Sequence, residues 1–269
     1  MKKNILVIVA MSLIMSILAV GGGEKKETNV EVDSLQYIQD KGTLVLGLDD
    51  AFPPMGFRDD SGEVVGFDID LAKQVAKRMG VELEIKPIDW DSKVFNLNNK
   101  DIDVIWNGLS ITDERKEKVD FSRPYINNSQ IIITNASSDI KTKDQLAGKV
   151  LGAQLGSSAQ DAVEADTEVN DSLKELRKFE SYTLALMDLE AGNVDAVVID
   201  EIVGRYYISK KPDLYKVATD DFGKEEYGIG FRKGDTEFVN GVNEALEEMI
   251  EDGTAKAISE KWFGENIMK

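Results

Sequence analysis

The chain of 269 residues contains neither cysteine nor histidine. Without cysteine there is no disulfide, no thiol nucleophile and no thiolate metal ligand. Without histidine, the commonest general base and metal ligand is also missing. Metal sites built only from oxygen ligands stay open, but the sequence has no EF-hand loop, no GxxxxGK phosphate loop and no GxGxxG motif. We therefore expect no catalytic residue, no bound metal and no cofactor.

Positive charge is also scarce. The chain has 32 Lys and Arg residues against 50 Asp and Glu residues, which gives a formal net charge of −18. An acidic surface without a basic cluster repels nucleic acid, so we expect no nucleic-acid partner. The hydrophobic share of 42% and the length of the chain suffice for a buried core and for two lobes.

The N-terminal residues have the pattern of an export signal. Two lysines precede the apolar run Ile5 to Val20, and three glycines follow it. We expect a signal at residues 1–23 and a charged, flexible tether at 24–34. A single membrane anchor is the alternative, although the run is shorter than the roughly 20 residues that span a bilayer. In both cases we expect the folded part outside the cytoplasm, in the periplasm or tethered at the outer face of the cell membrane.

Apolar periodicity predicts alternating strands and helices along the first half of the chain. This order is typical of a mostly parallel sheet with helices on its faces. The expected strands are 43–48, 82–88 and 103–107, and the expected helices are 67–79 and 94–97.

The pattern restarts in the second half, where residues 192–197 echo residues 100–105 in sequence and setting. Each segment follows a helix and leads into a strand that ends at a polar loop, which indicates two similar lobes. The expected strands are 130–134, 149–154, 194–199 and 228–231, with helices after Gly156 and Asp200, near Thr236 and at 255–262.

If the C-terminal helices pack on the first lobe, the chain crosses between lobes twice, near 127–129 and 218–225. We assign 35–127 and 225–269 to lobe 1 and 128–224 to lobe 2. Two crossings form a hinge, and a hinged cleft is a common ligand trap. The predicted fold class is α/β, with two Rossmann-like lobes joined by a two-strand hinge.

Arg115 is the first candidate for the binding site. It follows a predicted strand and the helix-capping residues Ser110 and Thr112, a position where open α/β sheets place ligands. Arginine grips a carboxylate with two parallel hydrogen bonds. The alternative is a solvated arginine within the charge run DERKEK.

Five motifs in order resemble the polar-amino-acid solute-binding proteins of bacterial ABC importers. They are GFDIDLAKQVAKRMG, GLSITDERKEKVDFSRPY, LGSSAQDAV, AVVIDE and GIGFRKGD, and the resemblance runs from about Leu35 to the end. It implies a periplasmic-binding-protein type II fold that closes on one free amino acid and docks on the permease subunits of an ABC importer. A monomer is expected. Relatives from Gram-positive bacteria usually carry a lipid-modified Cys at about position 22, where this chain has Gly22.

The resemblance implies roles at the two lobes. In lobe 1, Arg115 holds the ligand's α-carboxylate, while the backbone around Gly108 and the Ser110 hydroxyl lie by its α-ammonium group. In lobe 2, Ser157 and Ser158 add donors to the carboxylate, and Asp200 pairs with the α-ammonium group. The alternative for these three lobe 2 residues is helix capping, to which Ser and Asp are well suited.

The resemblance also implies a side-chain end of the site. Phe52 and Trp90 sandwich the ligand side chain, Asp49 meets its polar tip, and Asn107 is a further contact. A core role for the aromatics and a turn role for Asp49 are the alternatives. An acidic group with aromatic walls favours arginine or lysine, then glutamine, with cystine third.

Two other functions would suit the same scaffold. One is an enzyme such as a cyclohexadienyl-dehydratase-like lyase, which would need an acid or base in the cleft from Asp49, Asp200 or Glu201; no carboxylate pair has a spacing that argues for one. The other is an amino-acid sensor module, which would normally carry a transmembrane helix and an output domain. We expect binding and transport, not catalysis.

Overall fold

The computed structural model describes residues 33–269. The predicted signal at 1–23 and Gly22 lie outside the described residues, as does most of the predicted tether. Helix α1 (Ser34–Lys41) begins directly after its N-cap Asp33, whose side chain accepts hydrogen bonds from the first turn. These residues therefore belong to the folded part and not to a tether.

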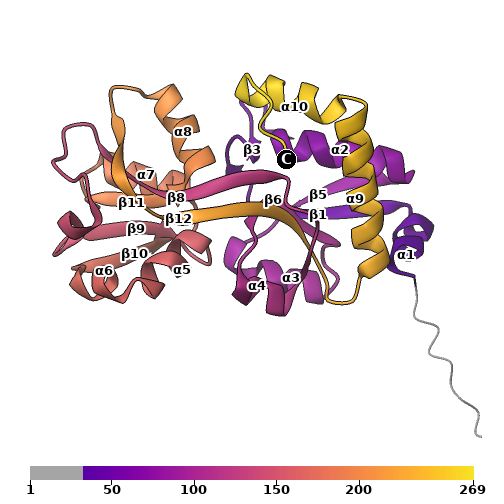
Figure 1. Ribbon diagram of the computed structural model, residues 1–269, viewed down its shortest axis with the longest axis horizontal. Coiled ribbons are helices and arrows are strands. Elements are labelled where there is room, and N and C mark those ends of the chain that lie inside the picture. The colour runs from indigo at the N-terminus through magenta and orange to yellow at the C-terminus, as the bar shows by residue number, and fades with distance from the viewer. Residues whose placement is uncertain (1–32) are drawn as a thin grey trace, which may run out of the picture. The chain divides into compact units, whose positions relative to one another are not determined.

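The largest sheet of the described residues is mixed and has nine strands (Figure 1). Its order is β10-β9-β11-β8-β12-β6-β1-β5, with β7 beside β12. The strands are β1 (Thr43–Leu48), β5 (Glu82–Pro87), β6 (Val104–Ser110), β7 (Asp120–Phe121), β8 (Ile126–Asn135), β9 (Val150–Gln154), β10 (Glu175–Phe179), β11 (Ala196–Asp200) and β12 (Tyr215–Phe231).

Each end of this sheet is parallel, as predicted. Strand β1 pairs in parallel with β5 and β6, and β9 pairs in parallel with β10 and β11. Between these ends, β8 and β12 run antiparallel and side by side between two groups of helices (Figure 1). They are the two strands of the predicted hinge, so the fold class is confirmed.

Helices cover both ends of the sheet. The C-terminal helices α9 and α10 pack on α1 and α2, so the end of the chain returns to its beginning as expected. The helices after α1 are α2 (Phe67–Met79), α3 (Lys93–Asn98), α4 (Asp113–Lys118), α5 (Ser158–Ala165), α6 (Thr167–Ser172), α7 (Tyr182–Glu190), α8 (Glu201–Lys210), α9 (Thr236–Glu251) and α10 (Thr254–Phe263), with 3-10 turns at Trp90–Ser92 and Lys143–Leu146.

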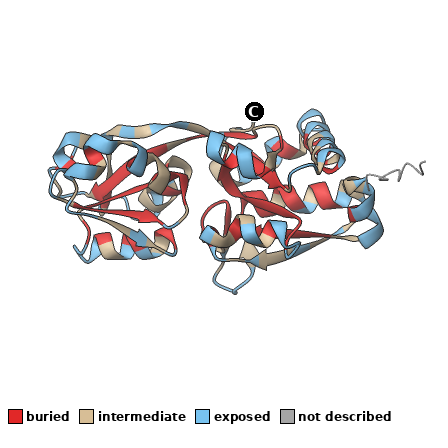
Figure 2. Cartoon of the chain, turned by 90° about the horizontal axis from the view of Figure 1, so that it is seen from below, coloured by how far each residue is buried: buried red, intermediate tan, exposed pale blue. Residues whose placement is uncertain are grey.

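Several elements differ from the sequence prediction. Strand β12 begins at Tyr215 and not near 228, because its first half is charged and partly exposed and lacks an apolar pattern. Strand β10 was not predicted, whereas the helix expected before residue 192 is α7. A second sheet of three short strands was also missed, because strands this short show no periodicity; they are β2 (Ala51–Phe52), β3 (Gly56–Arg58) and β4 (Val64–Val65). Buried residues follow the central strands (Figure 2).

The sequence similarity between residues 100–105 and 192–197 has a structural basis. Asp103 donates its backbone N–H to Val45 and accepts the Val45 N–H on its carboxylate, both at 2.8 Å. Asp195 makes the same pair of hydrogen bonds with Val150, again at 2.8 Å. Asp103 thus ties the start of β6 to β1, and Asp195 ties the start of β11 to β9.

Asp103 and Asp195 make equivalent hydrogen bonds but differ in burial, so replacing each one tests how burial changes the contribution of these bonds to stability. The Asp103 side chain is 3% exposed and pairs with Lys41 at 2.6 Å, whereas the Asp195 side chain is 40% exposed. Asp103→Ala leaves a backbone N–H and an ammonium group without their partner, so we expect it to lower the free energy of unfolding by about 2–4 kcal/mol. Asp195→Ala should cost about 1 kcal/mol. Urea denaturation measures both, and equal losses would contradict this ranking.

Candidate functional site

Arg115 is buried and bridges the two lobes. Helix α4 begins after Thr112, whose hydroxyl accepts the Arg115 N–H at 3.2 Å. The Arg115 side chain donates to the carbonyl oxygen of Ser110 at 3.1 Å and to that of Gly156 at 3.2 Å. Arg115 is only 7% exposed. The alternative of a solvated arginine on an exposed helical face is therefore excluded.

The serines of the two lobes meet beside Arg115. The hydroxyls of Ser110 and Ser158 lie 2.8 Å apart, and both residues are buried. Ser157 has a different role, because its hydroxyl accepts the N–H of Gln160 at 3.1 Å and caps α5. It also donates to the carbonyl oxygen of Gln154 at 2.7 Å. The structure thus places Ser110 and Ser158 together and engages Ser157 in capping.

Asp200 occupies the N-cap position of α8 but makes no capping hydrogen bond. Its carboxylate instead accepts from Asn128 at 2.7 Å, from Gln130 at 2.9 Å and from the Tyr227 hydroxyl at 2.8 Å. Burial raises the pKa of Asp200 to about 7, and the negative charge of Glu225 acts in the same direction. The structure thus turns the Asp200 side chain away from the helix it precedes.

Asp49 combines the turn role with a contact between the lobes. One carboxylate oxygen accepts the Ala51 N–H at 2.8 Å, and the other accepts from the Gln154 side chain of lobe 2 at 2.6 Å. Asn107 lies behind it and accepts the Asp49 N–H at 3.2 Å. Burial is the main reason that the pKa of Asp49 is raised. Within residues 33–269, Asp49 forms no ion pair.

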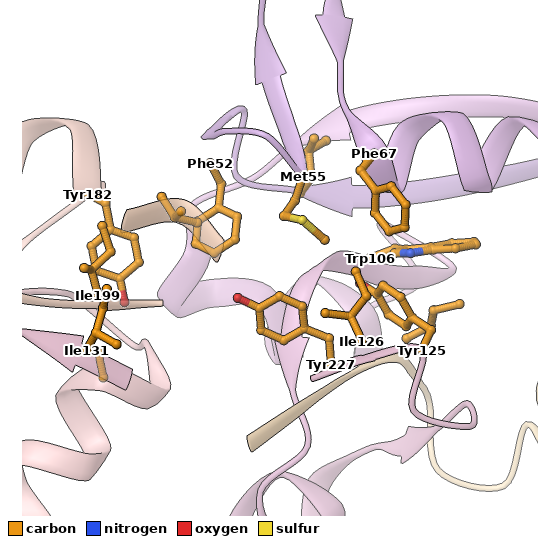
Figure 3. Packing of buried hydrophobic residues seen from close by; sticks show 14 of the residues in the cluster. Phe52, Met55, Phe67, Trp106, Tyr125, Ile126, Ile131, Tyr182, Ile199 and Tyr227 are labelled. Atoms are coloured by element: carbon orange, nitrogen blue, oxygen red, sulfur yellow. The ribbon is translucent and has the colours of Figure 1, made fainter. Parts of the chain in front are cut away.

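The two predicted aromatic walls lie in different surroundings. The ring centroid of Phe52 is 5.9 Å from that of Tyr182 in lobe 2, and Figure 3 shows the two rings side by side. On the lobe 1 side, Gly108 has a φ of 57°, and a Cβ there would lie 2.8 Å from the Phe52 ring. The close approach of the ring to the backbone therefore requires a glycine at this position.

Trp90 is buried in a second apolar cluster with Val45 and Leu97. Phe52 belongs to the other apolar cluster, and the two rings form no direct aromatic pair among the described residues, so their role as two walls around a ligand side chain stays a prediction. Trp90 does line a cavity of about 160 Å³ with Leu155 and Glu180 of lobe 2. Trp90 therefore borders the second lobe.

Lys93 is a buried cation that sequence reasoning missed. Its ammonium group donates to the carbonyl oxygen of Gly156 at 2.8 Å and to that of Trp90 at 3.0 Å. Burial lowers the pKa of Lys93 to about 7, and the charge of Arg115 adds to this effect. Lysine side chains are mostly exposed, so no sequence pattern indicated that Lys93 would be buried.

Polar residues of the hinge strands were missed as well. Asn128, Gln130, Glu225 and Tyr227 all contribute side chains to the network around Asp200. Figure 3 shows the Tyr227 hydroxyl pointing toward the side of Tyr182 and Ile199. In sequence, these residues lie in polar stretches that are also typical of solvent-facing strand positions.

Asp68 holds strand β6 of the site at Gly108. It is fully buried in α2, and its carboxylate accepts the Gly108 N–H at 2.7 Å. Burial raises the pKa of Asp68 to about 7, whereas the Gly108 N–H and the nearby Tyr125 and Trp106 side chains act in the opposite direction. The GFDID motif contained the signal, since an Asp on the apolar face of a helix requires a buried partner.

Comparison with known proteins identifies the protein family to which the chain belongs. The profile of the bacterial extracellular solute-binding proteins, family 3, matches residues 44–265, and the chain belongs to this family. It is 35% identical to the L-cystine-binding protein TcyJ of Escherichia coli K12, over 95% of this chain and 96% of the relative. It is 30% identical to the arginine-binding extracellular protein ArtP of Bacillus subtilis, over 98% of each chain.

Solved structures of similar proteins agree with this family assignment. A substrate-binding protein of an ABC uptake transporter from Streptococcus pneumoniae with bound histidine has a TM-score of 0.86 and 39% identity, over 88% of this chain and 99% of that chain. An ancestral arginine-binding protein bound to arginine has a TM-score of 0.79 and 44% identity, over 83% and 99%. The ancestral amino-acid-binding protein AncCDT-1, described as a precursor of cyclohexadienyl dehydratase, has a TM-score of 0.79 and 37% identity, over 86% and 99%.

These findings confirm the resemblance and the fold. The relatives are amino-acid-binding proteins, and membership of an extracellular family places the chain among exported proteins. Within residues 33–269, no helix combines the length and the apolar character needed to cross a membrane.

Proposed function

We propose that the protein binds a free polar or basic L-amino acid between its lobes and delivers it to the permease subunits of an ABC importer. The observation that carries this proposal is the gathering of Arg115, Ser110, Ser158 and Asp200 from both lobes into one buried polar region. An α-amino acid carries one carboxylate and one ammonium group, which match a buried arginine and a buried aspartate. The proposed lobes are 35–127 with 225–269, and 128–224.

Arg115 is proposed as the partner of the α-carboxylate. Its guanidinium group donates to two carbonyl oxygens, and neutral carbonyls are weaker acceptors than a carboxylate. Ser158 lies at the start of α5, where free N–H groups and the helix dipole also favour an anion. Asp200 is proposed as the partner of the α-ammonium group.

Asp49 is proposed to select the ligand side chain. Its carboxylate is buried and forms no ion pair within residues 33–269, so a cationic or amide-bearing side chain would complete its environment. We propose arginine or lysine first, then glutamine and cystine. The relatives' names include cystine and arginine, and the related structures hold histidine, arginine and glutamine.

A ligand-binding role fits this site better than a catalytic role. Asp49 and Asp200 belong to separate hydrogen-bond groups, each held by side-chain amides, so these two candidate residues do not form an acid–base pair. Glu225 lies near Asp200, but the two carboxylates share the donors Asn128 and Gln130, as expected of a site that binds a cation. We propose that the protein acts as a monomer, in the periplasm or tethered at the outer face of the cell membrane.

Arg115→Ala tests the carboxylate site. We expect binding of the preferred amino acid to weaken by about 2–5 kcal/mol, because the ligand carboxylate loses a buried charged partner. The fold should lose only about 1 kcal/mol, since Gly156 keeps its hydrogen bond from Lys93. Isothermal titration calorimetry measures the first quantity and urea denaturation the second. Lys116→Ala, an exposed change on the same helix, is the control, and near-normal affinity in Arg115→Ala would contradict the assignment.

A thermal-shift panel of the twenty amino acids and cystine tests the ligand class. A ligand at about a hundred times its dissociation constant stabilises the native state by about 2.7 kcal/mol, which raises the melting temperature measurably. We expect the largest shifts from arginine or lysine, and Asp49→Asn should weaken arginine more than glutamine. A larger shift from leucine or valine would refute the role of Asp49, and no shift from any ligand would refute the proposed function.

A further inference from the structure

Glu225 lies in β12, where the chain returns from lobe 2 to lobe 1. Side chains alternate along a strand, and neighbouring glutamates of β12 accordingly point in different directions. Glu226 pairs with Lys269 at the C-terminus. Glu225 instead turns its carboxylate toward the buried serines and amides of the site.

One carboxylate oxygen of Glu225 accepts hydrogen bonds from side chains of both lobes and of the hinge. Its Oε1 accepts from the Ser110 hydroxyl of β6 at 2.5 Å, from Asn128 at 2.6 Å and from Gln130 at 2.7 Å, both on β8. The hydroxyl of Ser158 in α5 lies 3.4 Å away. Glu225 therefore contacts the two serines that the proposed function places beside the ligand.

The same two amides join Glu225 to Asp200. Asn128 and Gln130 each donate from one nitrogen to Glu225 Oε1 and to Asp200 Oδ1. The two carboxylates thus face each other across a shared pair of neutral NH₂ groups. Within residues 33–269 neither carboxylate forms an ion pair. Two neighbouring carboxylates without a cation are unfavourable, and a positive group between them would relieve the repulsion.

We propose that Glu225 is a ligand-binding residue which, together with Asp200, forms a two-carboxylate site for the ligand's α-ammonium group. This inference rests on the proposed function. An ammonium group has three N–H donors, which suit the oxygens of Asp200, Glu225 and Ser110. No motif marks Glu225, because its position is defined only by the pairing of β12 with β8.

The proposed site also predicts that Asp200 releases a proton when the ligand binds. The titratable groups that face Asp200 are Glu225 and Tyr227 from β12 and Tyr182 from α7, and the pKa values of both tyrosines are raised well above 10, so they stay neutral. Arg115 of α4 reaches the network only through the Ser110 carbonyl oxygen. With a pKa of about 7, Asp200 is partly protonated at pH 7. A bound ammonium group favours its charged form, so the proton leaves to the buffer.

Glu225→Gln tests the inference by calorimetry with L-arginine, L-lysine, L-glutamine and L-cystine. We expect affinity for the ligand that binds to fall by at least about ten-fold. An analogue without the α-amino group, 5-guanidinopentanoate for arginine or glutaramate for glutamine, should lose little. Glu226→Gln, which changes the neighbouring glutamate, should bind normally. Unchanged or increased affinity in Glu225→Gln would overturn the inference.

Proton release gives a second readout. Titrations at pH 7 in phosphate and in Tris measure the net proton release on binding, to which Lys93 and Asp49 contribute alike in the wild-type protein and in Glu225→Gln. Glu225→Gln should release less, because the pKa of Asp200 falls when the neighbouring charge is removed. Equal release in both proteins would overturn the inference. If Asp200→Asn weakens binding and Glu225→Gln does not, only the role of Glu225 fails; if the wild-type protein binds none of the four amino acids, the proposed function fails first.

Discussion

The antiparallel pairing of β8 with β12 is the constraint on which the site depends. These strands carry the chain between the lobes, and their paired positions bring Asn128 of β8 opposite Glu225 of β12. The lobes meet beside this pair, where Arg115 of lobe 1 donates to Gly156 of lobe 2 and Ser110 contacts Ser158. The polar network of the site therefore closes only when both lobes and the hinge are in place.

The positive and the negative side chains of the site lie in two separate places. Arg115 and Lys93 both donate to the Gly156 carbonyl oxygen, so positive charge gathers at the start of α5. Asp200 and Glu225 gather negative charge at the hinge, held there by neutral amides. This separation of charge matches the two ends of an α-amino acid. It also explains why both a lysine and an aspartate of the site have pKa values of about 7, since each is buried near a like charge.

The sequence predicts the parts of this structure that have a local signal. Apolar runs predict the parallel strands, and a strand end followed by capping residues places Arg115 correctly at the start of α4. The hinge amides have no such signal, because Asn128 and Gln130 alternate along a strand as solvent-facing residues would. Whether such a side chain meets water or a buried carboxylate depends on which strand pairs beside it. The same applies to Lys93, whose burial follows from the approach of lobe 2 and not from its own helix.

A crystal structure of the protein with its bound amino acid tests the central claim most directly. The ligand is expected between the lobes, with its α-carboxylate within hydrogen-bond distance of the Arg115 guanidinium group and its α-ammonium group on the Asp200 carboxylate. An amino acid bound with these two ends reversed would contradict the claim. So would an amino acid bound elsewhere, for example in the cavity lined by Pro54, Tyr206 and Trp262.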